Sequence, residues 1–218
     1  MRHPYWPVFD LRLRTADLEL RPMTEADLTQ LADELPDDLE QDPASTRYDV
    51  ADPRVRRGII VHQGYWKYYG SWRPEAWRLN FVVRQAGQLI GVQELEGNDF
   101  LTLRIVDTSS YLVAAARGRG LGKRMRAAVL ALAFGPLAAE VAITSAWHDN
   151  GASLGVSRAL GYQPNGESRM EREGGLGVDA LIHLMLKREA WLASGHGDDV
   201  EIDGFDSCRP LFGLPAAG

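Results

Sequence analysis

A run of glycines and cations at residues 112–123, LVAAARGRGLGK, is the segment of this sequence best suited to chemistry. A strand-like stretch precedes it and a helix-like apolar pattern follows. Where a strand turns directly into a helix, backbone N–H groups and the helix dipole converge on one spot that favours anions. Glycines allow a phosphate to approach the backbone closely, and basic side chains bind its oxygens. We therefore predict a diphosphate site formed by Leu112, Val113, Arg117, Gly118, Arg119, Gly120, Leu121, Gly122 and Lys123.

Two common phosphate-binding patterns do not fit this segment. A P-loop requires glycine and serine or threonine where the chain has Arg117 and Arg124. A dinucleotide fingerprint requires a third glycine where the chain has Lys123. The pattern that fits is Arg-x-x-Gly-x-Gly, from Arg117 to Gly122. A basic helix cap with a glycine turn is the alternative that the residues leave open.

A second segment begins at Asn150, directly after the strand-like residues 141–147. It reads NGASLGVSRALGY, so a serine, Ser153, stands three residues after the asparagine and Leu160-Gly161 close the segment. Asn150 is expected to cap the helix that follows, and the hydroxyl of Ser153 has a local helix hydrogen bond as its simplest role.

Together the two segments resemble the GNAT N-acyltransferases, in which the first pattern binds the coenzyme A diphosphate and the second lies beside the thioester. The serine after the asparagine is typical of the RimJ/RimL-like branch, and the C-terminal DGFDSCRPLFG resembles an actinobacterial subgroup of it. The resemblance covers nearly the whole chain. One departure is Ser157, because many members carry a tyrosine there as general acid.

The resemblance implies an α/β fold, with a mixed, mostly antiparallel sheet flanked by helices and a splayed strand pair that holds coenzyme A. Residues 1–191 are expected to form one domain and residues 192–218 a tail that packs on it or on a partner subunit. Hydrophobic periodicity predicts strands at 18–23, 77–84, 89–95, 100–113, 141–147 and 180–186, and helices after Thr24 and at 54–72, 121–132 and 150–160. No clear period runs through the tail.

The implied reaction is attack of a primary amine on the thioester carbon of acetyl-coenzyme A or another short acyl-coenzyme A. A backbone N–H near Leu112 or Val113 is expected to bind the carbonyl oxygen. Ser153 is expected to protonate the departing thiolate or to donate a hydrogen bond to it. Two carboxylates are candidates for the base that takes the amine proton: Asp107, ten residues before Arg117, and Glu94, within an apolar strand. A surface role remains open for both. We expect His148 to pair locally with Asp149 and His183 to be a satisfied core histidine.

Composition excludes several other classes. The net charge of −6 argues against nucleic acid as a partner, Cys208 has no second cysteine to pair with, and no Cys/His cluster has metal-site spacing. No segment is long and apolar enough to span a membrane, so we expect a cytoplasmic protein without a metal. Residues 24–53 hold ten acidic side chains and one basic one, which favours a cationic acceptor.

The acceptor itself is left open: a protein N-terminus, a lysine or a small-molecule or antibiotic amine. Transfer of a larger group such as succinyl, and a non-catalytic module that binds coenzyme A, are the alternatives. The apolar residues Ile202, Phe205, Leu211 and Phe212 of the tail require a surface to cover them, and a homodimer is slightly favoured.

Overall fold

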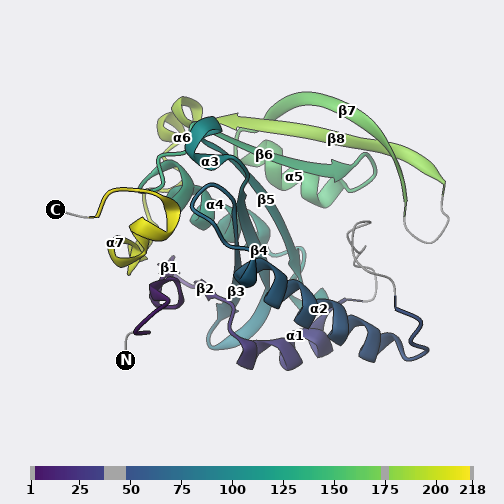
Figure 1. Ribbon diagram of the computed structural model, residues 1–218. Helices are drawn as coiled ribbons and strands as arrows, with labels where there is room; N and C mark the ends of the chain where they lie inside the picture. The colour runs from purple at the N-terminus through teal and green to yellow at the C-terminus, as the bar shows by residue number, and fades with distance from the viewer. Residues whose placement is uncertain (1–2, 37–47, 173–176, 217–218) are drawn as a thin grey trace.

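The computed structural model describes residues 3–36, 48–172 and 177–216. Within these residues a nine-stranded sheet runs through the molecule in the order β7-β8-β6-β5-β4-β3-β2-β1-β9, with helices on both faces (Figure 1). Strands β5 and β6 are parallel, and every other neighbouring pair is antiparallel. The predicted mixed, mostly antiparallel sheet is confirmed.

The strands are β1 (Arg12–Arg14), β2 (Glu19–Pro22), β3 (Trp77–Gln85), β4 (Gln88–Gly97), β5 (Ile105–Leu112), β6 (Val141–Trp147), β7 (Gln163–Glu171), β8 (Val178–Lys187) and β9 (Glu201–Asp203). The α-helices are α1 (Leu28–Glu34), α2 (Pro53–Gly70), α3 (Phe100–Leu103), α4 (Leu121–Phe134), α5 (Gly151–Ala159), α6 (Arg188–Ser194) and α7 (Phe205–Cys208). Short 3₁₀ turns stand at Pro7–Asp10, Glu25–Asp27, Ala114–Ala116 and Arg209–Phe212.

Two hydrophobic cores hold the helices to the sheet. The larger core packs α4 and α5 on one face, and α4 is buried over most of its circumference, as its nearly continuous apolar sequence requires. The smaller core packs α1 and the middle of α2 on the other face, around Val82 and Val92. The sheet therefore separates a face covered by α4 and α5 from a face covered in part by α1 and α2.

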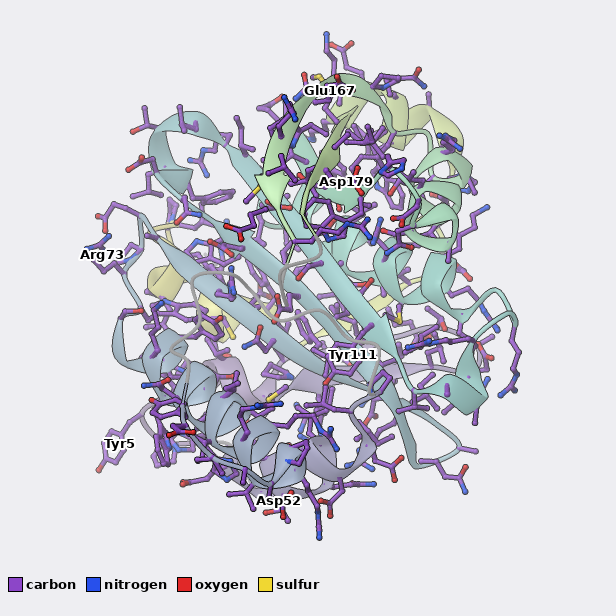
Figure 2. The ribbon with its side chains drawn as sticks, turned by 90° about the vertical axis from the view of Figure 1, so that its right-hand side faces the viewer. Tyr5, Asp52, Arg73, Tyr111, Glu167 and Asp179 are labelled. Carbon is purple, nitrogen blue, oxygen red and sulfur yellow. The ribbon has the colours of Figure 1, made fainter. Side chains whose placement is uncertain are left out.

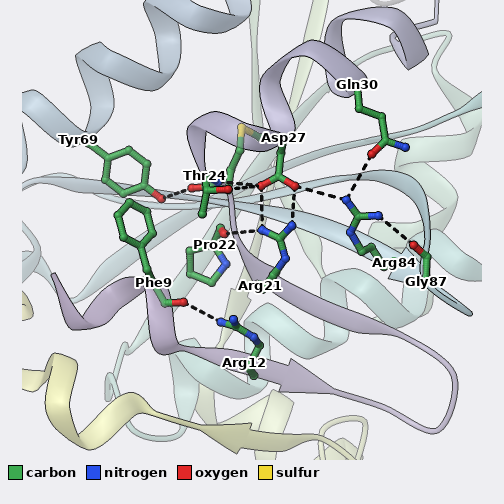
Figure 3. A network of polar contacts seen from close by, with 11 residues as sticks. Phe9, Arg12, Arg21, Pro22, Thr24, Asp27, Gln30, Tyr69, Arg84 and Gly87 are labelled. Atoms are coloured by element: carbon green, nitrogen blue, oxygen red, sulfur yellow. Dashed lines mark hydrogen bonds and ion pairs between the residues drawn. The ribbon is translucent and has the colours of Figure 1, made fainter. Parts of the chain in front are cut away.

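The α1–sheet junction depends on one buried carboxylate (Figure 3). Asp27, 4% exposed, accepts hydrogen bonds from the Thr24 backbone N–H at 2.9 Å and from Arg21 Nη1 at 2.8 Å, and Arg84 lies 3.3 Å away. Burial alone would raise the pKa of Asp27, but the hydrogen bonds from Arg21 and Thr24 outweigh it and lower the pKa to about 2. The predicted cap at Thr24 thus also anchors the helix to β2 and β3.

The strand predicted at 100–113 is only partly correct. Residues Phe100–Leu103 form the short helix α3, and β5 begins at Ile105. Asp99 and Arg104 flank α3 with φ of 48° and 52°, which an extended strand does not allow. Phe100 is fully buried there against Trp77. The helix predicted at 54–72 begins at Pro53 and ends at Gly70, with the Asp52 side chain accepting from the Arg54 N–H at 2.8 Å.

The C-terminal segment is part of the sheet and of the larger core. Strand β9 pairs with β1, and Phe205 and Phe212 are buried. Phe212 contacts the rings of Trp72 and Trp77, and Trp72 Nε1 donates to the carbonyl of Leu211 at 2.8 Å. Local periodicity does not indicate these short elements, because their strand and core partners lie far away in the sequence.

Candidate active site

The glycine loop joins β5 to α4 and leaves space for a ligand. Gly118 and Gly120 have φ of 72° and 74°, the left-handed region that favours glycine. A Cβ atom built on either residue would meet no described atom within 4 Å. Gly120 is also the residue from which α4 starts, so the N–H groups of the first turn are directed at this open space.

The third glycine of the pattern has a different environment. A Cβ on Gly122 would lie 3.4 Å from Val156 Cγ2 and 3.9 Å from Leu112 Cδ1. Gly122 therefore lets α4 approach α5 and β5 closely. Arg117 Nε donates to the Leu112 carbonyl at 3.2 Å, and Arg119 Nη2 donates to Gln85 Oε1 at 3.1 Å.

Strands β5 and β6 separate beside this loop. Their pairing covers only Ile105–Asp107 and Val141–Ile143, while β5 runs on to Leu112 and β6 to Trp147, and the two diverge (Figure 1). Where the pairing ends, Thr144 Oγ1 donates to the Thr108 carbonyl at 2.7 Å. The backbones of the two strands thus form a V, which we call the opening, with its narrow end at Asp107 and its wide end at the glycine loop.

One edge of this opening carries unused backbone donors. The Val113 N–H donates to the Ile90 carbonyl on β4 at 3.0 Å, so it is not directed into the opening. Donors alternate sides along a strand, so the N–H groups of Leu112 and Ser110 point away from β4 and toward β6. Of the two predicted oxyanion donors, Leu112 faces the opening and Val113 does not.

Helix α5 borders the other side of the opening. Asn150 Oδ1 accepts from the Ser153 N–H at 3.0 Å, so Asn150 caps this helix. Ser153 is half-buried, and its hydroxyl has no hydrogen-bond partner in the described chain. Ser157 is fully buried, donates to the Ser153 carbonyl at 3.0 Å and accepts from Arg126 Nη1 at 2.7 Å. Ser157 is thus held within the protein, whereas the Ser153 hydroxyl is available.

On the α2 face of the sheet, polar side chains stand in two cross-strand rows. Figure 2 looks onto this face, with Tyr111 on β5 near its middle. Residues directly opposite one another share a face, so the register groups Arg78, Glu96 and Asp107 in one row and Asn80, Glu94 and Ser109 in the next. Both predicted bases, Asp107 and Glu94, therefore lie on this face.

The two carboxylates differ in their partners. Glu94 accepts from the Ser109 hydroxyl and lies 3.9 Å from Arg78 Nη1. Arg78 Nε donates to Glu96 Oε2 at 2.6 Å. Asp107 makes no ion pair in the described chain, and burial raises the pKa of its carboxyl to about 6. A carboxyl with that pKa is ionised at neutral pH and basic enough to take a proton.

A cavity of about 280 Å³ lies next to the first row, between the end of α2 and the start of β3. It shares Arg78 and Glu96 with that row, so it borders the row to which Asp107 belongs. The cavity is lined by Lys67, Tyr68, Ser71, Arg73, Ala76, Trp77, Arg78, Glu96 and Asn98. Residues 37–47 of the acidic stretch lie outside the described residues.

The histidines have other partners. His148 Nδ1 lies 2.9 Å from Asp179 Oδ1, and Asp149 pairs with Arg172, so the predicted His148–Asp149 pair is wrong. His148 follows β6 and faces the neighbouring strand β8, which sequence proximity does not reveal. His183 lies between Ser145 and Ser168, at 2.8 and 2.9 Å. Both rings are thus engaged by the β6–β8–β7 side of the sheet.

Comparison with known proteins is decisive for the family. A sequence profile of the acetyltransferase (GNAT) domain matches residues 17–163. The chain belongs to this family. It is therefore an acyltransferase.

Solved structures of this family share the fold at low sequence identity. A putative acetyltransferase from T. thermophilus superposes with a TM-score of 0.66 at 17% identity, over 86% of this chain and 93% of that one. A Mycobacterium smegmatis RimJ in complex with CoA-disulfide gives 0.65 at 17%, over 89% and 98%. A chimera of spermidine N-acetyltransferase SpeG from Vibrio cholerae and hSSAT gives 0.64 at 16%, over 81% and 99%.

Among the described residues, no helix is long and apolar enough to cross a membrane, and no group of three or more His, Cys, Asp or Glu side chains is placed to hold a metal.

Two residues at the opening were missed from the sequence. Ser110 supplies an N–H that faces the opening, and Arg126 is buried beside it, with Nη2 donating to Ser110 Oγ at 3.3 Å. The sequence does contain a signal for Arg126, since this charged residue lies next to the apolar residues of α4. A charged residue at such a position favours a buried role over a solvated one.

Proposed function

We propose that this acyltransferase moves an acetyl group from coenzyme A to a primary amine by direct attack. The observation that carries the proposal is the V-shaped opening between β5 and β6. The glycine loop lies at its wide end, and Asp107, which makes no ion pair among the described residues, lies at its narrow end. A thioester that extends from the loop toward Asp107 would reach the amine between β5 and β6, where the separation of the strands connects the two faces of the sheet.

The glycine loop is the proposed diphosphate site. Gly118 and Gly120 leave the backbone open, and Arg117, Arg119 and Lys123 supply positive charge. The acyl arm would follow the free edge of β5, where the Leu112 N–H is directed to bind the carbonyl oxygen. Asn150 and Ser153 would border the arm from α5, with the available Ser153 hydroxyl near the sulfur.

The acceptor amine is proposed to enter on the α2 face. A lysine-type amine has a pKa of about 10.4 and an α-amine about 7.7–8, so at neutral pH it arrives mostly protonated. Asp107 takes that proton, directly or through water. The nitrogen lone pair then forms the bond to carbon, and the nitrogen loses its second proton to water. The carbon–sulfur bond breaks, its electron pair leaves on sulfur, and the thiolate then takes a proton from solvent. Glu94, already engaged by Ser109 and Arg78, is the weaker candidate for the base.

The finer assignments also stay proposals. Membership of the RimJ/RimL-like branch, and of its actinobacterial subgroup, rests on the sequence segments described above, with a RimJ among the structural neighbours. The structural neighbours include a spermidine N-acetyltransferase and a RimJ, at 16% and 17% identity, so both a polyamine and a protein are candidates for the acceptor. Succinyl transfer and a small-molecule amine remain the competing assignments.

Thiol release tests these assignments. Acetyl-coenzyme A and succinyl-coenzyme A are each mixed with spermidine, a lysine side-chain peptide and a peptide with a free N-terminus. Amine-dependent thiol release from acetyl-coenzyme A is expected. Turnover of succinyl-coenzyme A alone would replace the acetyl assignment, and absence of coenzyme A binding by calorimetry would overturn the cofactor site. The expected homodimer is checked on the same preparation by light scattering.

A further inference from the structure

Arg126 spans the two sides of the opening between β5 and β6. It lies on α4 and is only 2% exposed. Its guanidinium donates to Ser157 Oγ at 2.7 Å and to Ser110 Oγ at 3.3 Å. Ser110 belongs to β5, and Ser157 belongs to α5, which follows β6. A fixed positive charge therefore lies at the floor of the proposed thioester channel.

This charge has no partner of opposite sign. In the described chain the guanidinium of Arg126 is bonded only to serine hydroxyls and forms no ion pair with a carboxylate, and its buried Nε has no hydrogen-bond acceptor. Burial lowers the pKa of Arg126, while Tyr162 and Asp107 act in the opposite direction from further away. Taking a cation out of water costs several kcal/mol unless it is compensated. A buried cation of this kind is explained most simply by a negative charge that it meets during function.

The thioester chemistry supplies such a charge at this place. The Leu112 and Ser110 N–H groups face the opening, so a carbonyl bound there sets its carbon, and the sulfur attached to it, next to Ser110. Arg126 already touches the Ser110 side chain. When the amine attacks, the electron pair of the carbon–sulfur bond moves onto sulfur, and a thiolate develops beside Ser110, on the side of the opening where the guanidinium lies.

We propose that Arg126 is a positioning residue whose positive charge stabilises the coenzyme A thiolate as it leaves. The inference rests on the proposed function. The thiolate later takes a proton from solvent, so the step needs no other reactant. Ser110 and Ser157 hold the guanidinium in place, and because the Ser157 hydroxyl already donates to the Ser153 carbonyl, it serves as an acceptor for Arg126.

Titration of bound coenzyme A tests the proposal without turnover. The ultraviolet absorbance of the thiolate is followed against pH for the unmodified protein and for Arg126→Met, Arg126→Lys and Arg124→Met. Arg124 is a matched control, because it lies on the same helix but is ion-paired with Asp17 at the surface. The pKa of the bound thiol should lie below that of free coenzyme A. It should rise by about 1 to 3 pH units in Arg126→Met, partly recover in Arg126→Lys and not change in Arg124→Met.

Comparing the binding of coenzyme A and desulfo-coenzyme A distinguishes an effect of the Arg126 charge from a purely structural role of this residue. At alkaline pH, Arg126→Met should weaken coenzyme A binding about tenfold or more, and leave the affinity for desulfo-coenzyme A unchanged. Equal loss for both ligands, or a bound thiol that titrates identically in both proteins, would overturn the proposal. Because Met replaces a buried cation with an apolar chain of similar length, the variant is expected to fold. If Arg126→Met does not fold, Arg126→Lys is used alone. The proposal is then overturned if Arg126→Lys leaves the pKa of the bound thiol unchanged and weakens the binding of coenzyme A and desulfo-coenzyme A equally.

Failure of the proposed function gives a different result. If the unmodified protein binds neither coenzyme A nor desulfo-coenzyme A, the cofactor site is wrong. If it binds both equally and the thiol pKa matches that of free coenzyme A, only the role of Arg126 is wrong.

Discussion

Asp107 and Glu94 show how contacts give two carboxylates different chemistry. In the sequence Glu94 interrupts an apolar strand and Asp107 stands ten residues before Arg117, and both are candidates for the base. In the structure Glu94 is engaged by Ser109 and Arg78, whereas Asp107 is unpaired at the narrow end of the opening. The difference arises from cross-strand register, which a single strand's sequence does not contain.

Replacing Asp107 tests its role as base. For the unmodified enzyme, kcat/KM should rise with pH through about 6, where the Asp107 carboxyl ionises. Asp107→Asn should lower activity at neutral pH by about 10²–10⁴-fold and regain part of it at high pH, where the amine deprotonates unaided. Glu94→Gln is the paired comparison, and its kcat/KM should still rise with pH near pH 6. Full activity of Asp107→Asn at neutral pH would instead favour a water relay and an α-amine acceptor.

The same substitution should not destabilise the protein. The folded-state pKa of Asp107, about 6, lies above the ordinary value of 3.8, so the folded state binds more protons between these pH values. Stability is then lost as pH rises through that window, and the ionised carboxylate carries a cost above it. At pH 7, Asp107→Asn should raise the free energy of unfolding by up to about 3 kcal/mol, measured by urea denaturation. A marked loss of stability would show that Asp107 is a structural residue.

Asp27 shows the opposite sign of linkage. Its folded-state pKa, about 2, lies below the ordinary 3.8, so its contribution is present above pH 3.8 and disappears as pH falls toward 2. At neutral pH, Asp27→Asn should cost about 2 kcal/mol or more, because Arg21 and Arg84 lose their buried partner. The exposed pair of Asp33 with Arg54 supplies the control, and Asp33→Asn should have no measurable effect. If both variants unfold at the same urea concentration, the network in Figure 3 does not stabilise the fold.

At the scale of elements, the glycine loop depends on backbone freedom. Gly120→Val places a β-branched side chain at φ of 74°, and its methyl groups would occupy the open space of the proposed diphosphate site. Calorimetry should show coenzyme A affinity reduced by about 10²-fold or more, about 3 kcal/mol. Gly70→Ala is the matched control, since that helical glycine also has open space around it. Unchanged affinity in a folded Gly120→Val protein would contradict the cofactor assignment.

The C-terminal segment is predicted to be indispensable for stability. Truncation after Ser194 removes β9 and the buried Phe205 and Phe212, and it exposes the edge of β1. The shortened chain should aggregate, as light scattering would reveal. Phe212→Ala alone should cost about 3–5 kcal/mol, whereas Leu192→Ala, at a 59% exposed position, should be nearly neutral. A truncated chain that stays soluble and unfolds at the same temperature would make the segment dispensable.

Long, periodic elements could be predicted from the sequence, and short or polar ones could not. Strands β3, β4, β6 and β8 and helices α2, α4 and α5 carry their own apolar patterns, so local reasoning finds them. Strand β7 does not, because QPNGESRME is polar and almost wholly exposed, and its pairing with β8 alone makes it a strand. Strands β1 and β9 have three residues each, too few for a visible period, and only pairing makes them strands: β1 pairs with β2 and β9, and β9 pairs with β1.

At the scale of the whole molecule, the sheet organises the site by keeping two approaches apart. The face covered in part by α2 carries Asp107, Glu94 and the cavity beside α2, and the other face carries α4, α5 and Arg126. The opening between β5 and β6 joins them. The glycine loop, Asp107 and Glu94 were all predicted from the sequence, and their roles stay predictions. Arg126 and the available N–H of Ser110 escaped, because their importance follows from where β5 and β6 part.

The pairing of β1 with β9 has a consequence for how the chain matures. Arg14 bonds to Asp203, 189 residues away, so β1 gains its partner β9 only after all the residues between them have been synthesised. Closing so large a loop costs little more entropy than closing a moderate one, since the cost grows only with the logarithm of length. The β1 edge nevertheless stays uncovered until β9 has been synthesised, and an uncovered strand edge can pair with a neighbouring chain. Because β1 and β9 lie side by side, a circular permutant that joins the segment after β9 to the segment before β1, and is opened at the β3–β4 turn, should bring the two strands close together in the sequence and protect that edge early.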